Sequence, residues 1–120
     1  MSLVQNFKNI TWKAENVPTP STENVYTCPT APDAKTSILI GCDIANLTNS
    51  GVSVTVAIYD ASKAEAFNIV QNAPIAVGSS LQVINKQKHI LEEGDILQVT
   101  PDQGNQSVGL VGACMEISLS

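Results

Sequence analysis

The strongest constraint on this chain is a hydrophobic period of two, which recurs in three separate segments. Apolar residues occupy every second position at Ile38, Ile40, Cys42 and Ile44, at Val52, Val54, Val56 and Ile58, and at Val111, Ala113, Met115 and Ile117. Because successive side chains of a strand point to opposite faces, each set predicts one face of a β-strand. β-Branched residues dominate these runs, as is typical of strands.

Turn residues divide the chain into short strands. We expect strands at about residues 4–12, 24–28, 36–47, 51–59, 66–71, 80–85, 87–92 with 95–99 as a hairpin, and 107–119. Asn49-Ser50-Gly51 predicts a second hairpin turn. Lys63–Val70 could form two helical turns, but its composition favours a strand or loop. This spacing predicts a single-domain antiparallel β-sandwich, jelly-roll-like, of about eight strands over residues 1–120. Residues 1–22, a strand and a loop with two prolines, are a candidate assembly arm.

The charge balance excludes several classes of partner. The chain has 120 residues and a formal net charge of −5, with six lysines and no basic cluster beyond Lys86 and Lys88. A nucleic-acid binder should show a basic stripe, so we expect no nucleic-acid partner. No apolar run approaches about 18 residues, and no signal peptide is visible, so we expect no membrane partner. Charged residues make up only 14%, which suggests that much of the surface is neutral or is covered by a partner.

The stretch HILEEGDILQV gathers the single histidine and three carboxylates, His89, Glu92, Glu93 and Asp95. It could form a metal site or an acid–base pair, or it could be a turn between two strands. Along a strand, His89 and Glu93 would lie about 13 Å apart, too far for one metal ion. Gly94 can supply a positive φ, and Asp95 can bond the turn backbone. We therefore predict a turn, with no metal ion and no cofactor.

The remaining nucleophiles give no catalytic signature. Cys28, Cys42 and Cys114 form no CxxC motif and no supported disulfide, and Cys42 and Cys114 lie in apolar runs typical of buried residues. No local motif ties the histidine to a cysteine, and the serines after Gly78 lack a nucleophile elbow. The sequence predicts no catalytic residues, so we expect a protein that is not an enzyme.

Five aromatic residues are spread along the chain. Phe7, Trp12, Tyr26 and Tyr59 are candidate interface residues, and Trp12 stands out because it lies in the polar run NITWKAEN. A carbohydrate-binding module is the alternative, since such modules display aromatic platforms. An exposed Trp12 or Tyr59 beside a polar cleft would favour that alternative.

The order of these segments resembles small virion structural proteins of tailed bacteriophages, including marine phages and cyanophages. The motifs that carry the resemblance are a Tyr-Thr-x-Pro opening, an asparagine in the next strand, and two turns. The matching residues are Tyr26, Thr27 and Pro29; Asn46; Pro74, Gly78, Ser79, Ser80 and Leu81; and Leu91, Glu92, Gly94 and Asp95. The chain departs from the pattern between Pro74 and Gly78, where Ile-Ala-Val replaces a shorter link.

The resemblance implies an assembly role and no catalysis. We expect a capsid decoration or cement protein made in the host cytoplasm and located in the virion. Its partners would be copies of itself in a homo-oligomer and other virion proteins, either the major capsid protein or neck and tail proteins. A neck, tail or fibre component is the alternative within this class.

Overall fold

The computed structural model describes residues 3–84 and 88–119, and every regular element in this part of the chain is a strand. The strands are β1 (Leu3–Lys13), β2 (Glu23–Thr27), β3 (Thr36–Asn46), β4 (Val52–Asp60), β5 (Glu65–Ile75), β6 (Ser80–Ile84), β7 (His89–Leu91), β8 (Ile96–Pro101) and β9 (Val108–Leu119). The predicted all-β fold is confirmed. Most predicted bounds agree closely, although β5 continues past its predicted end to Ile75. Lys86 and the predicted strand limits at 85 and 87 lie outside the described residues. Among the described residues no helix could span a membrane.

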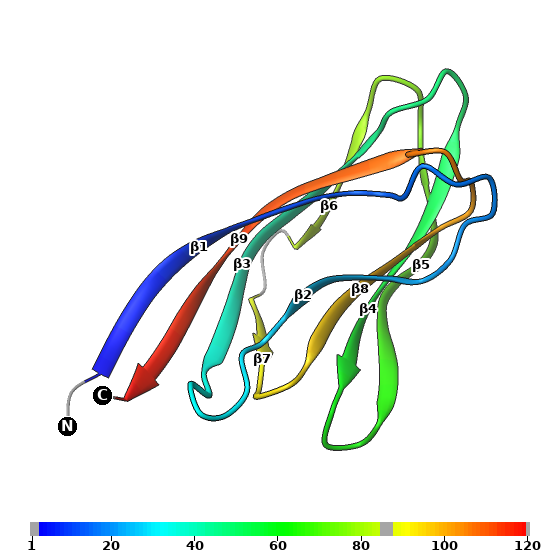
Figure 1. Ribbon diagram of the computed structural model, residues 1–120. Helices are drawn as coiled ribbons and strands as arrows, with labels where there is room; N and C mark the ends of the chain where they lie inside the picture. The colour runs from blue at the N-terminus through cyan, green and yellow to red at the C-terminus, as the bar shows by residue number, and fades with distance from the viewer. Residues whose placement is uncertain (1–2, 85–87, 120) are drawn as a thin grey trace.

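Two antiparallel sheets stack on each other (Figure 1). Sheet A has the order β1-β9-β3-β6, and β7 also pairs with β3; sheet B has the order β2-β8-β4-β5. In sheet A, β1 and β9 run side by side from Leu3 opposite Leu119 to Lys13 opposite Gly109. Both ends of the described chain therefore lie together at one end of sheet A (Figure 1).

The core lies between the inner faces of the two sheets. Its buried apolar residues are Ile10, Ala14, Tyr26, Cys28, Leu39, Cys42, Ile44, Val52, Val54, Val56, Ile75, Ile84, Leu91, Leu97, Val99, Val108, Leu110 and Cys114. Burying a valine, leucine or isoleucine side chain stabilises a fold by about 1.5–3 kcal/mol relative to leaving it exposed. Because these residues come from both sheets, the apolar inner faces are what hold the sandwich together.

Two predicted hairpins are wrong, because both turns carry the chain from one sheet to the other. β7 pairs with β3 in sheet A, whereas β8 pairs with β2 and β4 in sheet B. In the same way, β3 belongs to sheet A and β4 to sheet B. Turn residues reverse the chain, but they do not decide whether the next strand hydrogen-bonds beside the first or stacks across the core. The described residues form nine strands rather than about eight, because β7 and β8, which the sequence predicts as one hairpin, are separate strands of different sheets.

Asn46 fixes the turn between β3 and β4. Its side chain is buried, and its amide donates to the carbonyl oxygens of Ser50 at 2.7 Å and Ile75 at 3.0 Å. Its Oδ1 accepts from the backbone and hydroxyl of Thr48, both at 2.8 Å. The asparagine therefore bonds the turn and the end of β5 at once, and the crossing between the sheets has a defined path.

A β-bulge corrects the predicted face of β3. The pairing of β3 with β9 shifts between Leu39 and Gly41, so the alternation of side chains changes at that point. Leu39 is buried before the bulge, and Cys42 and Ile44 are buried after it, whereas Ile38 and Ile40 are only partly buried. The expectation that Ile38 and Ile40 share a face with Cys42 and Ile44 is wrong, since a sequence gives no sign of one extra residue in a ladder.

Candidate functional site: the outer face of sheet A

The carboxylate cluster of HILEEGDILQV is a structural turn. Asp95 is buried, and its two carboxylate oxygens accept from the backbone N–H groups of Ala61 and Glu92, each at 2.9 Å. Gly94 has φ of 85° and donates its N–H to the carbonyl of Cys28 at 3.0 Å. The predicted roles of Gly94 and Asp95 are confirmed. Among the described residues no three of the histidine, cysteine and carboxylate side chains are grouped as metal ligands would be.

The outer face of sheet A carries a continuous apolar row. Phe7 on β1 lies opposite Met115 on β9, Met115 lies opposite Ile38 on β3, and Ile38 lies opposite Ile90 on β7. Directly opposed residues of an antiparallel sheet place their side chains on the same face. This face is the outer one, because the neighbouring residues Cys114 and Leu39 point into the core. Phe7 is 78% exposed and Ile90 is 64% exposed, so the row is open to solvent at both ends.

The same face contains a shallow hollow of about 530 Å³ between β1, β9 and β3. Gly109 and Ala45, which lie opposite each other, contribute little side-chain volume there. Leu47 and Val111 line it and are 50% and 66% exposed. Lys13 and Asp43 are the charged residues among those that line it. The outer face of sheet A therefore offers both a raised apolar row and a recess that could accept a partner's side chain.

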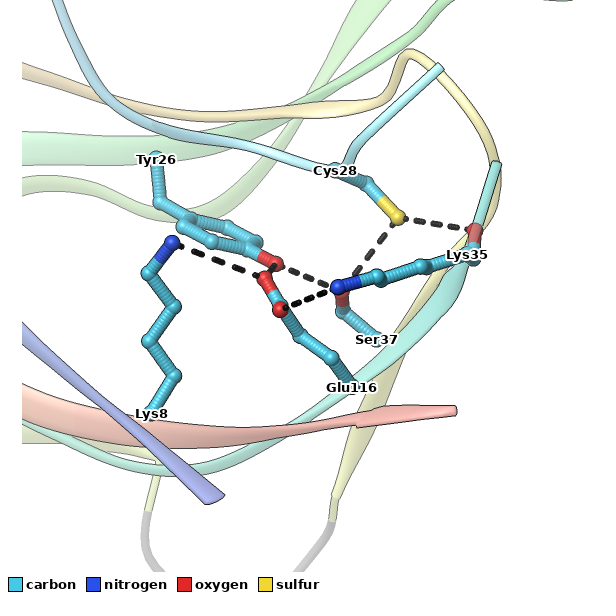
Figure 2. A network of polar contacts seen from close by, with 6 residues as sticks. All are labelled: Lys8, Tyr26, Cys28, Lys35, Ser37 and Glu116. Atoms are coloured by element: carbon cyan, nitrogen blue, oxygen red, sulfur yellow. Dashed lines mark hydrogen bonds and ion pairs between the residues drawn. The ribbon is translucent and has the colours of Figure 1, made fainter. Parts of the chain in front are cut away.

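A polar network lies between the sheets, on the inner face of β9 (Figure 2). The hydroxyl of Tyr26 donates to the buried carboxylate of Glu116 and also bonds the hydroxyl of Ser37 at 2.7 Å. The carboxylate of Glu116 also lies 3.4 Å from the ammonium group of Lys35 and 3.9 Å from that of Lys8. Glu116 and Ser37 belong to sheet A and Tyr26 belongs to sheet B, so the network joins the two layers.

Burial and charge shift the pKa values of this network in opposite directions. Burial would raise the pKa of Glu116, but the hydrogen bond from Tyr26 and the ammonium groups of Lys8 and Lys35 outweigh it, so this pKa lies below its usual range. Burial, followed by the bond to Glu116, raises the pKa of the Tyr26 hydroxyl. Glu116 is therefore held as an anion and Tyr26 as a neutral donor, which is a stable pairing rather than a poised acid–base pair.

The three cysteines are free thiols buried in the core. Burial raises the pKa of Cys28 and of Cys114, and it raises the pKa of Cys42 to about 12. A thiol must ionise and reach a substrate to act as a nucleophile. These side chains therefore behave as small core residues, and the buried positions predicted for Cys42 and Cys114 are confirmed.

The structure separates the four aromatic interface candidates. Phe7 lies on the outer face of sheet A, while Tyr59 is half-buried in sheet B. Trp12 is half-buried, and its indole N–H donates to Glu23 at 3.2 Å. Tyr26 is 8% exposed and belongs to the core. The interface role of these residues stays a prediction, and Phe7 has by far the largest free surface of the four.

Sequence reasoning missed Ile38 and Ile90 as surface residues. The signal available for β9 was the alternation that placed Met115 and Ile117 with Val111 on one face, and the structure shows that this face points outward. Both faces of β9 contain apolar residues, so periodicity alone could not identify the inner one. Only the pairing of strands distant in sequence brings Phe7, Met115, Ile38 and Ile90 into a single row.

Comparisons with known proteins show where this fold occurs. No family model and no curated protein matches the chain. Among solved structures, it is similar to a chain of the acid-stable capsid of Helicobacter pylori bacteriophage KHP30, with a TM-score of 0.53 and 10% identity over 99% of this chain and 94% of that one. It is also similar to the VP2 protein of infectious bursal disease virus, with a TM-score of 0.54 and 12% identity over 94% of this chain. The match spans only 31% of VP2.

A third likeness is to a protein of Bacillus endospore appendages, described as a novel family of disulfide-linked pili. The TM-score is 0.48 and the identity 22%, over 99% of this chain and 90% of that one. At all these identities the likeness concerns the fold. The β-sandwich of this chain is thus shared with proteins from viral capsids.

Proposed function

We propose that this chain is a non-enzymatic structural protein of a virion, which decorates the capsid by docking the outer face of sheet A onto the shell. The observation that carries the proposal is the apolar row of Phe7, Met115, Ile38 and Ile90 on that face. A fold shared with capsid proteins and the resemblance of its turns to phage virion proteins support the same assignment.

The row is unusual for a surface that stays in water. Single exposed apolar residues are common on folded proteins, but contiguous apolar patches mark sites of association. Here the residues are adjacent across four strands. Docking would remove them from water without disturbing the core, since the same strands bury a separate set of side chains on their inner face.

The hollow at Gly109 complements the row. The residues that contribute most to interface affinity usually sit in pockets near the centre of the contact. An aromatic or aliphatic side chain of the shell protein could enter the hollow beside Leu47 and Val111, and Lys13 and Asp43 could bond polar groups at its rim. A raised row and a recess on one surface would together fix the orientation of the docked subunit.

The first test is the composition of purified particles. We expect the chain in gradient-purified virions at a fixed ratio to the major capsid protein, measured by quantitative mass spectrometry. A capsid decoration protein should be present at a copy number comparable to that of the major capsid protein, whereas a neck or tail-tip component should be present at a far smaller one. Absence from the particles would overturn the virion assignment. A low copy number would instead indicate that the chain belongs to the neck or tail and not to the capsid.

The second test asks which face docks. Ile90→Lys places a charge in the apolar row, and Thr100→Lys is the matched control because Thr100 is partly exposed on sheet B. Stripped particles are mixed with each purified variant and sedimented. We expect Ile90→Lys to be lost from the pellet and Thr100→Lys to be retained like the wild type. Retention of Ile90→Lys together with loss of Thr100→Lys would assign docking to sheet B instead.

A further inference from the structure

The free edge of β1 lacks the prolines, bulges and short length that protect many edge strands, and its inward-pointing Lys8 is paired with Glu116 at 3.9 Å. An edge strand presents unpaired N–H and C=O groups, and proteins commonly block them with prolines, bulges or short strands. β1 runs without a register shift from Leu3 to Lys13 against β9 and contains no proline and no positive φ. The edge strand of a sheet is thus left as an uninterrupted template of eleven residues.

The other described edges are all interrupted. β2 has five residues and a bulge between Asn24 and Tyr26, and β6 and β7 have five and three residues. β5 is as long as β1, but it has two register shifts, a positive φ of 49° at Asn72, and Pro74. The contrast between β5 and β1 indicates that the β1 edge is kept open for a partner strand.

The geometry points to a second copy of this chain as that partner, with the two β1 strands paired antiparallel about a two-fold axis that passes between the two Phe7 residues. Such a contact uses the same surface on both copies and closes as a dimer. It would join two copies of sheet A into one continuous sheet. The inference concerns the edge of the sheet and does not depend on the docking of its outer face.

The residues of β1 favour this register over the one centred on the neighbouring Lys8. Registers that keep both outer faces on the same side pair odd-numbered with odd-numbered residues. Centring the axis on Lys8 would set two lysines directly opposite each other, which is destabilising. Centring it on Phe7 places Phe7 opposite Phe7, Val4 opposite Ile10, and Asn6 opposite Lys8. An aromatic pair and an aliphatic pair replace the clash of like charges.

The surroundings of β1 have room for this contact. A groove of about 340 Å³ runs between β1 and β2, lined by Lys8–Thr11 and by Val25–Thr27. In the Phe7-centred register, Val4 of the second copy lies beside Ile10 and points inward, toward this groove. The 78% exposure of Phe7 would fall because each ring would pack against its symmetry mate. The pairing therefore accounts for the most exposed large apolar residue of the described chain.

The experiment measures mass in solution by size-exclusion chromatography with light scattering. We expect a dimer for the wild type and a dissociation constant at least about tenfold weaker for Phe7→Lys, which removes the aromatic pair and opposes two charges. Ile90→Lys is the control, since Ile90 lies on β7, away from the β1 edge, and it should remain dimeric. A wild-type monomer at every concentration overturns the inference. So does a dimer that Ile90→Lys breaks and Phe7→Lys leaves intact.

A mixing experiment tests the register itself. Phe7→Lys and Phe7→Glu should each be weakened alone, whereas a one-to-one mixture should recover dimers because the opposite charges then face each other across the axis. Phe7→Cys should form an intermolecular disulfide on mild oxidation. Asn9→Cys should not, because in this register Asn9 lies opposite Gln5. Cross-linking of Asn9→Cys but not of Phe7→Cys, or no recovery in the mixture, would overturn the proposed register.

Discussion

The outer faces of the two sheets differ, although their inner faces are alike. On sheet A, Phe7, Met115, Ile38 and Ile90 form an apolar row across four strands. On sheet B, side chains bond one another: Gln98 donates to Asn24 at 3.0 Å, and the hydroxyls of Thr22 and Thr100 lie 2.7 Å apart. Thr55 lies directly opposite Thr100 and extends this polar ladder.

Folding alone does not explain this difference. A sandwich needs one apolar face on each sheet, and the shared core supplies both. Sheet B shows that an outer face of this fold can be largely polar, although Ile96 and Tyr59 lie opposite each other on it. The apolar outer face of sheet A is therefore best explained by association.

The largest expected effect is the difference in the free energy of unfolding between a substitution on the inner face of sheet A and one on its outer face. Leu39→Ala removes a fully buried side chain and should lower the free energy of unfolding by about 2–5 kcal/mol. Ile90→Ala should change it by no more than about 0.5 kcal/mol, because Ile90 is already mostly in water. Urea denaturation of both variants measures the two values. Equal losses would mean that the outer row belongs to the fold's own core.

The second prediction concerns the network that joins the sheets. Glu116→Gln should lower the free energy of unfolding by about 1–3 kcal/mol at neutral pH, because it weakens the bonds of a buried carboxylate to Tyr26 and Lys35. The exposed Glu93→Gln is the control and should cost no more than about 0.5 kcal/mol. A cost for Glu116→Gln as small as that of the control would show that the network does not hold the layers together.

The difference in the free energy of unfolding between wild type and Glu116→Gln should depend on pH in one direction. The pKa of Glu116 is lower in the folded chain than its ordinary value of 4.5. The stability that its ionised form contributes is therefore complete above pH 4.5 and is lost as the pH falls through the folded-state pKa. We expect the difference between wild type and Glu116→Gln to be largest at neutral pH and to shrink below pH 4.5. A gap that widens in acid would contradict this.

Much of the fold could be predicted because it depends on local signals. Alternation and turn residues located the strands, and the turn roles of Gly94 and Asp95 followed from their chemistry. The pairing of strands could not be predicted, because Asn49-Ser50-Gly51 reverses the chain equally well within a sheet or between sheets. The inner face of β9 was hidden for the same reason. The docking face depends on contacts between residues as distant as Phe7 and Met115, so no local pattern contains it.

A smaller effect is expected at the hollow of the outer face. Gly109→Ala adds one methyl group, which would lie 3.4 Å from Leu47 and reduce the recess. Sedimentation with stripped particles should show affinity for the capsid reduced by about two- to fivefold, equivalent to roughly 0.5–1 kcal/mol. Stability should stay within about 0.5 kcal/mol of wild type, because the position is at the surface. Unchanged affinity would mean that the apolar row docks without a contribution from the hollow.

The smallest effect is expected on sheet B. Gln98→Leu breaks the exposed hydrogen bond to Asn24 and adds one apolar side chain to the polar face. Because both amide groups can bond water instead, the free energy of unfolding should change by no more than about 0.5 kcal/mol. Particle affinity should also stay unchanged, since the cross-strand neighbours of Gln98 are Asn24 and the buried Ala57, so a single leucine forms no exposed apolar row there. If Gln98→Leu alone strengthened docking on sheet B, isolated apolar residues would be sufficient, and the continuity of Phe7, Met115, Ile38 and Ile90 would lose its significance.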